Sequence, residues 1–205
     1  MNYMKYAAVI ITFFISVSLS TQCFAIGDVS KELKPALDTL TSILADDSLK
    51  GDENKKVRRE KIMEAIKLKF DFREMSKRIL GKTWNNISAE ERDYFTVIMT
   101  KFLENIYIGR LETYSGQEIV FAGEQIDEKK KIAKVKTTVE YNGSDLPIFY
   151  FLKKKESWMV YDINIEGLRL VNNYRKQFGS ILRKEKFDGL VKVIEKKNKS
   201  FETKE

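Results

Sequence analysis

The chain has 205 residues and a formal net charge of +7 at pH 7. It contains no histidine and a single cysteine, Cys23, so disulfides within the chain, Ser-His-Asp triads, imidazole acid–base catalysis and ordinary zinc sites are excluded. A basic balance can indicate anionic partners such as membrane surfaces or an acidic protein, but solvated hairpin loops and a solvated tail are the favoured explanation of the lysine runs.

The first 25 residues have the three parts of a cleavable export signal. Lys5 gives a positive start, residues 7–19 form an apolar core, and Cys23-Phe24-Ala25 offers a cleavage site after Ala25. A membrane-spanning helix needs about 20 apolar residues, and this run is shorter and lacks a basic flank. A lipid-anchored Cys23 is disfavoured because the bulky Gln22 precedes it. We expect an exported protein, with a single-span anchor as the alternative.

The rest of the chain reads as one domain over residues 26–198, followed by a charged tail over 199–205. It contains no repeat and no Pro/Gly-rich linker. A chain of this length can bury roughly 70% of its unfolded surface.

Apolar spacing predicts two helices at the start of this domain. The first covers residues 29–46, with Pro35 in its first turn. After a polar break over 46–54, the second passes through Ile62 and Ile66.

Two capping signals follow. Asp71 and Glu74 form a capping pair that opens a short third helix, which Gly81 ends. The sequence Ser88-Ala89-Glu90-Glu91 is a capping box and opens a long helix with a nearly continuous apolar stripe that reaches Tyr114.

The periodicity then changes to two, which predicts strands. Asn142-Gly143 between two such runs indicates a two-residue hairpin, and the short connections predict an antiparallel meander. Lys134 and Lys136 alternate with apolar residues, so one face of the second strand should be solvated. The third strand is apolar on both sides and should be central. The four strands are expected over residues 117–126, 132–141, 145–152 and 158–165.

Helical spacing returns after Gly167 through Leu182, and a last helix carries residues 187–194. The sequence therefore predicts an α+β fold in which a four-stranded antiparallel meander sheet is wrapped by N- and C-terminal helices.

Several short motifs in this order resemble one family. Over residues 29–197 the chain is similar to the MlaC / toluene-tolerance family of periplasmic phospholipid-binding proteins. The motifs that carry the resemblance are Phe70-Asp71-Phe72, Leu80-Gly81-x-x-Trp84, the box Ser88-x-x-Glu91, Tyr107, Tyr114, Trp158-x-Val160-Tyr161-Asp162, Glu166-Gly167 and Phe187-Asp188-Gly189-Leu190.

The resemblance implies a soluble periplasmic carrier that holds a phospholipid by its acyl chains in an apolar cavity. Such a carrier shuttles lipid between an outer-membrane lipoprotein complex and an inner-membrane ABC transporter with its lipid-binding ring, and so maintains outer-membrane lipid asymmetry. The sequence has no phosphate-binding glycine loop, so we expect no enzymatic activity, and export together with scattered charges disfavours a nucleic-acid partner. We also expect a monomer without cofactor or metal.

For the lining of this cavity we select apolar and aromatic residues of the long helix, the strands and the helix after Gly167. An error of one residue in strand facing would exchange two of them, Phe149 and Phe151, for Ile148 and Tyr150. Trp84 and Trp158 are expected to pack structurally. The selected residues are Phe70, Met75, Leu80, Phe95, Met99, Phe102, Leu103, Tyr107, Val135, Val139, Phe149, Phe151, Tyr161, Ile163, Val171, Tyr174 and Phe178.

Three other interpretations remain open. Asp162 beside Tyr161 could be the acid of an isomerase-like enzyme, although capping backbone amides or pairing with Arg169 is the favoured role for this carboxylate. The domain could instead have a closed core and act as an interaction protein. Finally, the cargo could be a hopanoid or another membrane lipid.

Overall fold

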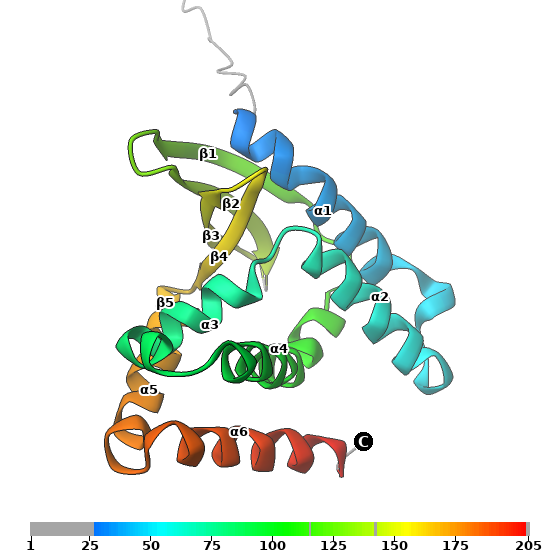
Figure 1. Ribbon diagram of the computed structural model, residues 1–205. Coiled ribbons are helices and arrows are strands. Elements are labelled where there is room, and N and C mark those ends of the chain that lie inside the picture. The colour runs from blue at the N-terminus through cyan, green and yellow to red at the C-terminus, as the bar shows by residue number, and fades with distance from the viewer. Residues whose placement is uncertain (1–26, 115, 142, 204–205) are drawn as a thin grey trace, which may run out of the picture.

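The computed structural model describes residues 27–114, 116–141 and 143–203, so the predicted export signal lies outside the described residues. Within them, helices from both ends of the chain cover one face of an antiparallel sheet and lie beyond one of its edges (Figure 1). The helices are α1 (Asp28–Ala45), α2 (Lys55–Lys67), α3 (Phe72–Leu80), α4 (Ala89–Glu112), α5 (Leu170–Lys184) and α6 (Lys186–Glu202). The strands are β1 (Ile119–Asp127), β2 (Ile132–Tyr141), β3 (Ser144–Lys154), β4 (Trp158–Ile165) and β5 (Leu168–Arg169).

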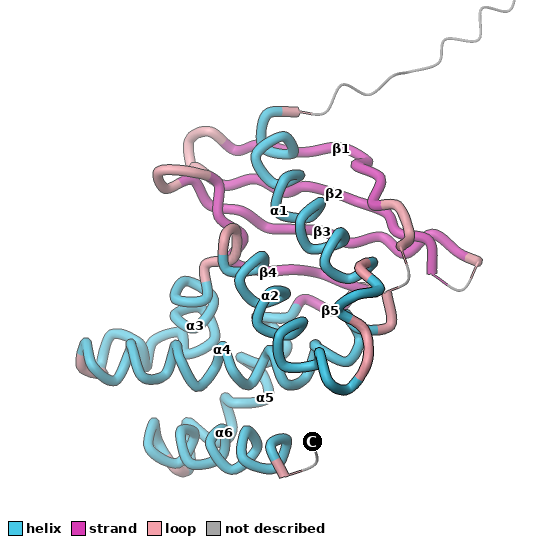
Figure 2. The backbone as a smooth tube through the Cα atoms, turned by 90° about the vertical axis from the view of Figure 1, so that its right-hand side faces the viewer, coloured by secondary structure: helices cyan, strands magenta, loops and turns pink. Residues whose placement is uncertain are grey.

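The sheet is a meander with the strand order β1-β2-β3-β4-β5, and each strand is antiparallel to its neighbours (Figure 2). The predicted α+β class and the central place of the apolar third strand, β3, are confirmed. The sequence predicted four strands, whereas the sheet has five. A tight turn at Glu166 and Gly167, both with positive φ, folds Leu168 and Arg169 back onto β4 as the short β5.

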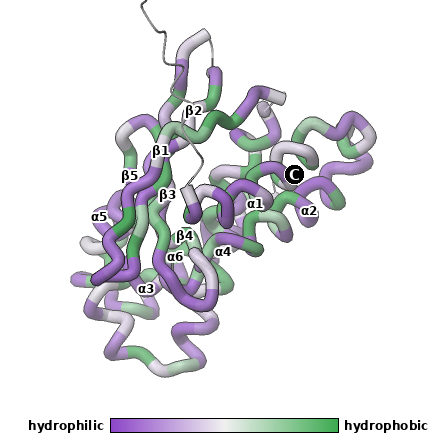
Figure 3. The backbone as a smooth tube through the Cα atoms, turned by 90° about the horizontal axis from the view of Figure 1, so that it is seen from above, coloured by the Kyte–Doolittle hydropathy of each residue, from purple (hydrophilic) through white to green (hydrophobic). Residues whose placement is uncertain are grey.

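The hairpin between β2 and β3 sets the facing of the sheet. Tyr141 pairs with Ser144, and Val135 lies opposite Tyr150. Val135 and Tyr150 belong to the face that we call the inner face, whereas Lys134 and Lys136 belong to the outer face. The strands accordingly carry both hydrophilic and hydrophobic residues (Figure 3).

Neither edge of the sheet is a regular, unpaired strand. The linker between α2 and α3 runs beside the first half of β4: the Val160 amide donates to the Lys69 carbonyl (2.7 Å), and the Asp71 amide donates to the Val160 carbonyl (2.8 Å). On the opposite edge, the register of β1 shifts between Phe121 and Glu124, which marks a bulge.

Helix α1 lies across the inner face of the sheet (Figure 2). Its buried residues Val29, Leu33 and Leu37 pack on β2, β3 and β4. Gly27, before the helix, offers no capping side chain, and the carboxylate of Glu124 on β1 takes this role by accepting bonds from the Ser30 amide (2.8 Å) and hydroxyl (2.6 Å). Side-chain polar contacts thus reinforce the apolar docking of α1.

A second contact of this kind lies one turn along α1. Glu32 accepts bonds from the Trp158 amide and from Lys154, both at 2.9 Å. The same helix also corrects a prediction: Pro35 lies inside α1 and not in its first turn. The helix tolerates this proline because Pro35 is exposed, so the carbonyl that lacks its usual donor is on the solvent side.

The predicted capping box of α4 is confirmed. Ser88 Oγ accepts from the Glu91 amide (3.1 Å) and Glu91 accepts from the Ser88 amide (2.6 Å). Asp71 caps α3 through the Glu74 amide (3.0 Å), but the Glu74 carboxylate binds Arg78 instead of closing the pair. Helix α6 continues to Glu202, into the segment 199–205 that we expected to be a tail.

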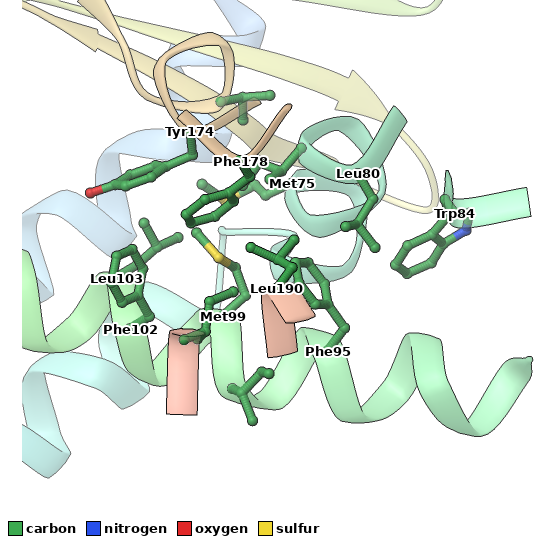
Figure 4. Close-up of a cluster of buried hydrophobic side chains, with 14 of the residues drawn as sticks. Met75, Leu80, Trp84, Phe95, Met99, Phe102, Leu103, Tyr174, Phe178 and Leu190 are labelled. Atoms are coloured by element: carbon green, nitrogen blue, oxygen red, sulfur yellow. The ribbon is translucent and has the colours of Figure 1, made fainter. Parts of the chain in front are cut away.

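Helices α3, α4, α5 and α6 form a second layer around their own core. Figure 4 shows side chains from all four helices pointing toward one another. At its centre, the rings of Phe102 and Tyr174 meet edge to face with centroids 5.4 Å apart, and Phe178 packs against both. No helix in the described part of the chain is long and apolar enough to cross a membrane.

Candidate functional site

Among the described residues, most of the buried hydrophobic side chains belong to three separate clusters. The helical cluster joins α3, α4, α5 and α6, and the sheet cluster joins α1 to the inner face of the sheet. The third cluster contains Leu44, Ile62 and Ile108, where α1, α2 and α4 meet. A domain usually has one contiguous core. Here Phe70 and Ile163 pack against both larger clusters without merging them.

Half-buried apolar side chains lie at the margins of all three clusters. Such side chains keep apolar surface that a ligand can cover, and an apolar lining is the common property of lipid and small-molecule sites. We call them the margin residues. They are Phe72, Ile87, Ile106, Tyr107, Ile181, Leu182 and Val191 beside the helical cluster, Ile119, Phe121 and Ile148 beside the sheet cluster, Leu40, Ile43, Ile66, Leu111 and Tyr114 beside the third, and Phe70 and Ile163 between the first two.

A pocket of about 530 Å³ opens between α1 and β1, and its volume is within the usual range for ligand sites. We call it the α1–β1 pocket. The margin residues Tyr114, Ile119 and Phe121, together with Val120, supply its apolar side chains. The polar side comes from α1 and from the segment before β1, with Lys34, Asp38, Thr41, Gln117 and Glu118.

The polar side of the pocket is partly neutralised within α1, where Lys34 Nζ lies 2.7 Å from Asp38 Oδ2. Burial raises the pKa of Tyr114, whose hydroxyl donates to the Gln117 carbonyl. The pocket therefore combines an apolar wall with a polar mouth, where Glu118 adds a carboxylate to the Lys34–Asp38 pair. This arrangement suits an amphipathic ligand whose polar end stays near water.

The structure places most of the residues selected from the sequence inside the filled helical cluster. Phe95 is 0% exposed and Met99 is 1% exposed, and side chains of the same cluster surround them. The residues in this position are Met75, Leu80, Phe95, Met99, Phe102, Leu103, Val171, Tyr174 and Phe178. In this structure they occupy core positions, and their role in lining a lipid site stays a prediction.

The expected facing is wrong for Phe149 and Phe151. They lie opposite Lys136 and Lys134, on the outer face, whereas Val135 faces inward. Lys134 Nζ stands 5.4 Å from the Phe149 ring centroid, and the Arg169 guanidinium stands 3.9 Å from that of Phe151. These two rings therefore cannot share a cavity wall with Val135.

The inner-face positions of β3 belong to Ile148 and Tyr150, the pair that the sequence analysis named as the alternative. Val135 is fully buried in the sheet cluster, and Val139 is half-buried on the same inner face. The Arg78 guanidinium lies 3.8 Å from the ring centroid of the buried Tyr161.

Three of the selected residues, Phe70, Tyr107 and Ile163, are margin residues. Tyr107 lies beside the hydroxyl of Tyr174, whose pKa is raised by burial and by this neighbour. The α1–β1 pocket contains none of the selected residues. Phe70 borders a second pocket of about 510 Å³, together with Phe72 and Met159.

The favoured structural role of Asp162 is confirmed. The carboxylate is 1% exposed; one oxygen accepts from the Val171 amide at the start of α5 (2.9 Å), and the other binds Arg169 (2.7 Å to Nη2). Trp84 and Trp158 are both buried, as expected, and Arg73 and Arg92 lie near the Trp84 ring. Among the described residues, no group of acidic, histidine or cysteine side chains could hold a metal ion.

The sequence analysis missed the margin residues of α1, α2 and β1. For Leu40 and Ile43 the signal was present, because the helical spacing of α1 continues beyond the part that packs on the sheet. For Ile148 the two-residue hairpin already fixed the facing relative to Val135. Tyr114 and Phe121 needed the tertiary structure, which alone shows that β1 approaches α1.

Comparisons with known proteins agree with this architecture. The family model described as MlaC protein matches residues 34–196. A curated relative, the intermembrane phospholipid transport system binding protein MlaC of Haemophilus influenzae, is 26% identical over 193 residues, which cover 89% of this chain and 88% of the relative.

Among solved structures, a phospholipid-binding protein from Ralstonia solanacearum in complex with a phospholipid is similar, with a TM-score of 0.77 and 25% identity. The match covers 85% of this chain and 99% of that chain. The family match spans most of this chain, including α2 to α5, the whole sheet and most of α1 and α6. The chain therefore belongs to the MlaC family.

Proposed function

We propose that this chain is a periplasmic carrier that binds a phospholipid by its acyl chains and transfers it between two membranes. The observation that carries the proposal is the similarity, over 85% of this chain, to a protein whose structure contains a bound phospholipid. The name of the Haemophilus influenzae relative, which refers to intermembrane phospholipid transport, supports the same function.

The energetics of lipid transfer explain why such a carrier needs an apolar site. Each acyl CH₂ kept from water is worth about 0.8 kcal/mol, so two chains of about 16 carbons would cost more than roughly 20 kcal/mol in water. A protein cavity that shields the chains about as well as a bilayer makes transfer nearly neutral. The partners of the carrier must then supply the direction of transport.

The margin residues are the part of this chain best suited to cover the acyl chains. They are apolar, keep exposed surface and come from both layers of the fold. In this proposal the chains enter through the α1–β1 pocket and spread along the inner face of the sheet. The headgroup stays at the mouth, beside Lys34, Asp38 and Thr41.

The family resemblance supports two docking partners. These are an outer-membrane lipoprotein complex and an inner-membrane ABC transporter with its lipid-binding ring. Cleavage of the export signal near Ala25 would release the chain into the periplasm, where it could reach both membranes.

Lipid extraction followed by mass spectrometry tests the proposal directly. The exported protein is purified from its native envelope, and we expect a phospholipid in an amount comparable to the protein. A hopanoid or another lipid would change the cargo but keep the carrier function. Protein without any lipid would contradict the proposal and favour an interaction protein with a closed core.

A pair of variants tests the position of the site. Ile119→Arg introduces a charge on the inner face at the α1–β1 pocket and should abolish lipid binding, because a buried unpaired charge is costly. Gln125→Arg, on the outer face of the same strand, is the matched control and should keep its lipid. If Ile119→Arg folds and retains lipid, the acyl chains do not occupy this pocket.

A further inference from the structure

A hydroxyl pair interrupts the apolar middle of the inner face. Thr137 on β2 and Tyr150 on β3 both belong to this face, and their hydroxyl groups are neighbours. Burial raises the pKa of Tyr150 to about 12, and the Thr137 hydroxyl partly opposes this shift. Glu124, a charged group on the same face, is already engaged by the first turn of α1.

The hydroxyl of Thr137 is not satisfied by the protein. The residue is 0% exposed, and Oγ1 has no hydrogen bond of good geometry to any described residue. If the Tyr150 hydroxyl donates to Thr137 Oγ1, the Thr137 hydrogen itself still has no acceptor among the described residues. An unsatisfied buried donor is costly, and a valine would have nearly the same shape and a similar preference for strands. Packing therefore does not account for a threonine at this position.

The position of Thr137 points to the bound lipid as the missing partner. On β1 its paired residue is Phe121, and on β3 it is Ile148, and both of these neighbours are margin residues. Phe121 also borders the α1–β1 pocket. Paired side chains in a sheet have Cβ atoms about 5 Å apart, so the Thr137 hydroxyl lies directly behind the pocket wall.

We propose that Thr137, assisted by Tyr150, donates a hydrogen bond to an acyl ester carbonyl of the bound phospholipid. The inference rests on the proposed carrier function and adds a recognition point to it. A carbonyl is a good acceptor, and in a phospholipid it lies where the tails join the glycerol. A hydrogen bond there holds the tails on the inner face and the headgroup at the mouth, once the Phe121 ring turns aside.

A competition between two lipids tests this assignment. Vesicles contain equal amounts of an ester-linked phosphatidylglycerol and its ether-linked analogue, which lacks the carbonyls but matches it in headgroup and chain length. The exported protein is incubated with these vesicles and separated from them, and the bound lipids are quantified by mass spectrometry. One neutral hydrogen bond should give the wild type a preference of about three- to tenfold for the ester lipid.

The variants locate the source of this preference. Thr137→Val should reduce the ratio to about one, whereas Thr137→Ser, which keeps the hydroxyl, should retain the preference. Thr138→Val on the outer face is the matched control and should behave like the wild type. Equal uptake of both lipids by the wild type, or an unchanged preference in Thr137→Val, would overturn the inference but not the carrier function. Uptake of neither lipid by the wild type would instead contradict the carrier function itself.

Discussion

The side chains of Asp162 and Arg169 tie the end of the sheet to the helical layer. Arg169 Nη2 lies 2.7 Å from Asp162 Oδ2, while Asp162 Oδ1 accepts from the first turn of α5. One carboxylate thus holds β4, the short β5 and α5 together. Because it is 1% exposed and doubly engaged, its role is structural and depends on its charge.

Substitutions of Asp162 should separate these two contacts. Asp162→Ala loses the cap and the ion pair, so we expect the free energy of unfolding to fall by about 2–4 kcal/mol. Asp162→Asn keeps an oxygen for the Val171 amide and should lose only about 1–2 kcal/mol. Urea unfolding followed by circular dichroism measures both losses.

The matched control for these variants is Asp145→Ala, an exposed aspartate at the start of β3. It should change stability by less than about 0.5 kcal/mol. If Asp162→Ala is as stable as this control, the buried carboxylate does not hold α5 in place.

The cap that Glu124 gives to α1 should be measurable locally. Glu124→Ala leaves the first amides of α1 without an acceptor, and we expect a loss of about 1–2 kcal/mol together with faster hydrogen exchange over residues 28–33. Glu124→Gln keeps an acceptor oxygen and should lose less. Glu128→Gln, in the exposed turn after β1, serves as the control; equal exchange in all variants would show that α1 does not need this cap.

Acid should weaken the docking of α1 through Glu32. Burial acts to raise the pKa of Glu32, but the bonds from the Trp158 amide and from Lys154 outweigh it, so the pKa is lowered from 4.5. The stability from this group is therefore fully present above its unfolded pKa and is lost as the pH falls through the lower folded pKa.

Glu32→Gln should remove this part of the acid sensitivity. Its free energy of unfolding should change less than that of the wild type between pH about 7 and about 3. Glu156→Gln, an exposed glutamate in the turn before β4, provides the comparison. Identical pH curves for wild type and Glu32→Gln would rule out this contribution.

Substitutions in the helical cluster should separate residues that stabilise the fold from residues that bind lipid. Met99→Ala removes a side chain that is 1% exposed and should cost about 2–5 kcal/mol, while the lipid content per folded molecule stays unchanged. Ile106→Ala changes a margin residue of the same helix and should show the opposite pattern, with a small stability loss and less lipid. Thermal unfolding and lipid mass spectrometry of both proteins decide between a core and a lining position for Met99.

Much of the fold followed from local signals in the sequence. The predicted strand over 132–141 has the bounds of β2, and the strand over 158–165 has those of β4. The capping residues Ser88 and Asp71 marked the starts of α4 and α3 because an N-cap is a contact within one turn. The two-residue β5 was not predictable, since so short a strand has no periodicity.

The cavity lining was harder because a buried apolar stripe looks the same whether a protein core or a ligand covers it. Phe95 and Met99 obey the helical spacing as well as Ile106 and Tyr107 do, yet the first two are enclosed by α5 and α6 and the last two are half-buried. Which residues of the stripe are enclosed depends on where α5 and α6, which are distant in the sequence, pack against α4. The facing of the strands, in contrast, could have been predicted, because the register of the hairpin links Val135 to Tyr150.

The linker beside β4 also protects the sheet from uncontrolled association. Residues 69–71 occupy the first half of that edge, and β5 occupies the second half. The opposite edge, β1, is interrupted by its bulge, and Gly123 there has a positive φ that bends the strand. A neighbouring copy therefore meets no long, straight row of free backbone groups on which to add a strand. In the proposed carrier, these protected edges would keep copies of the chain from adding strands to one another while the apolar interior is open.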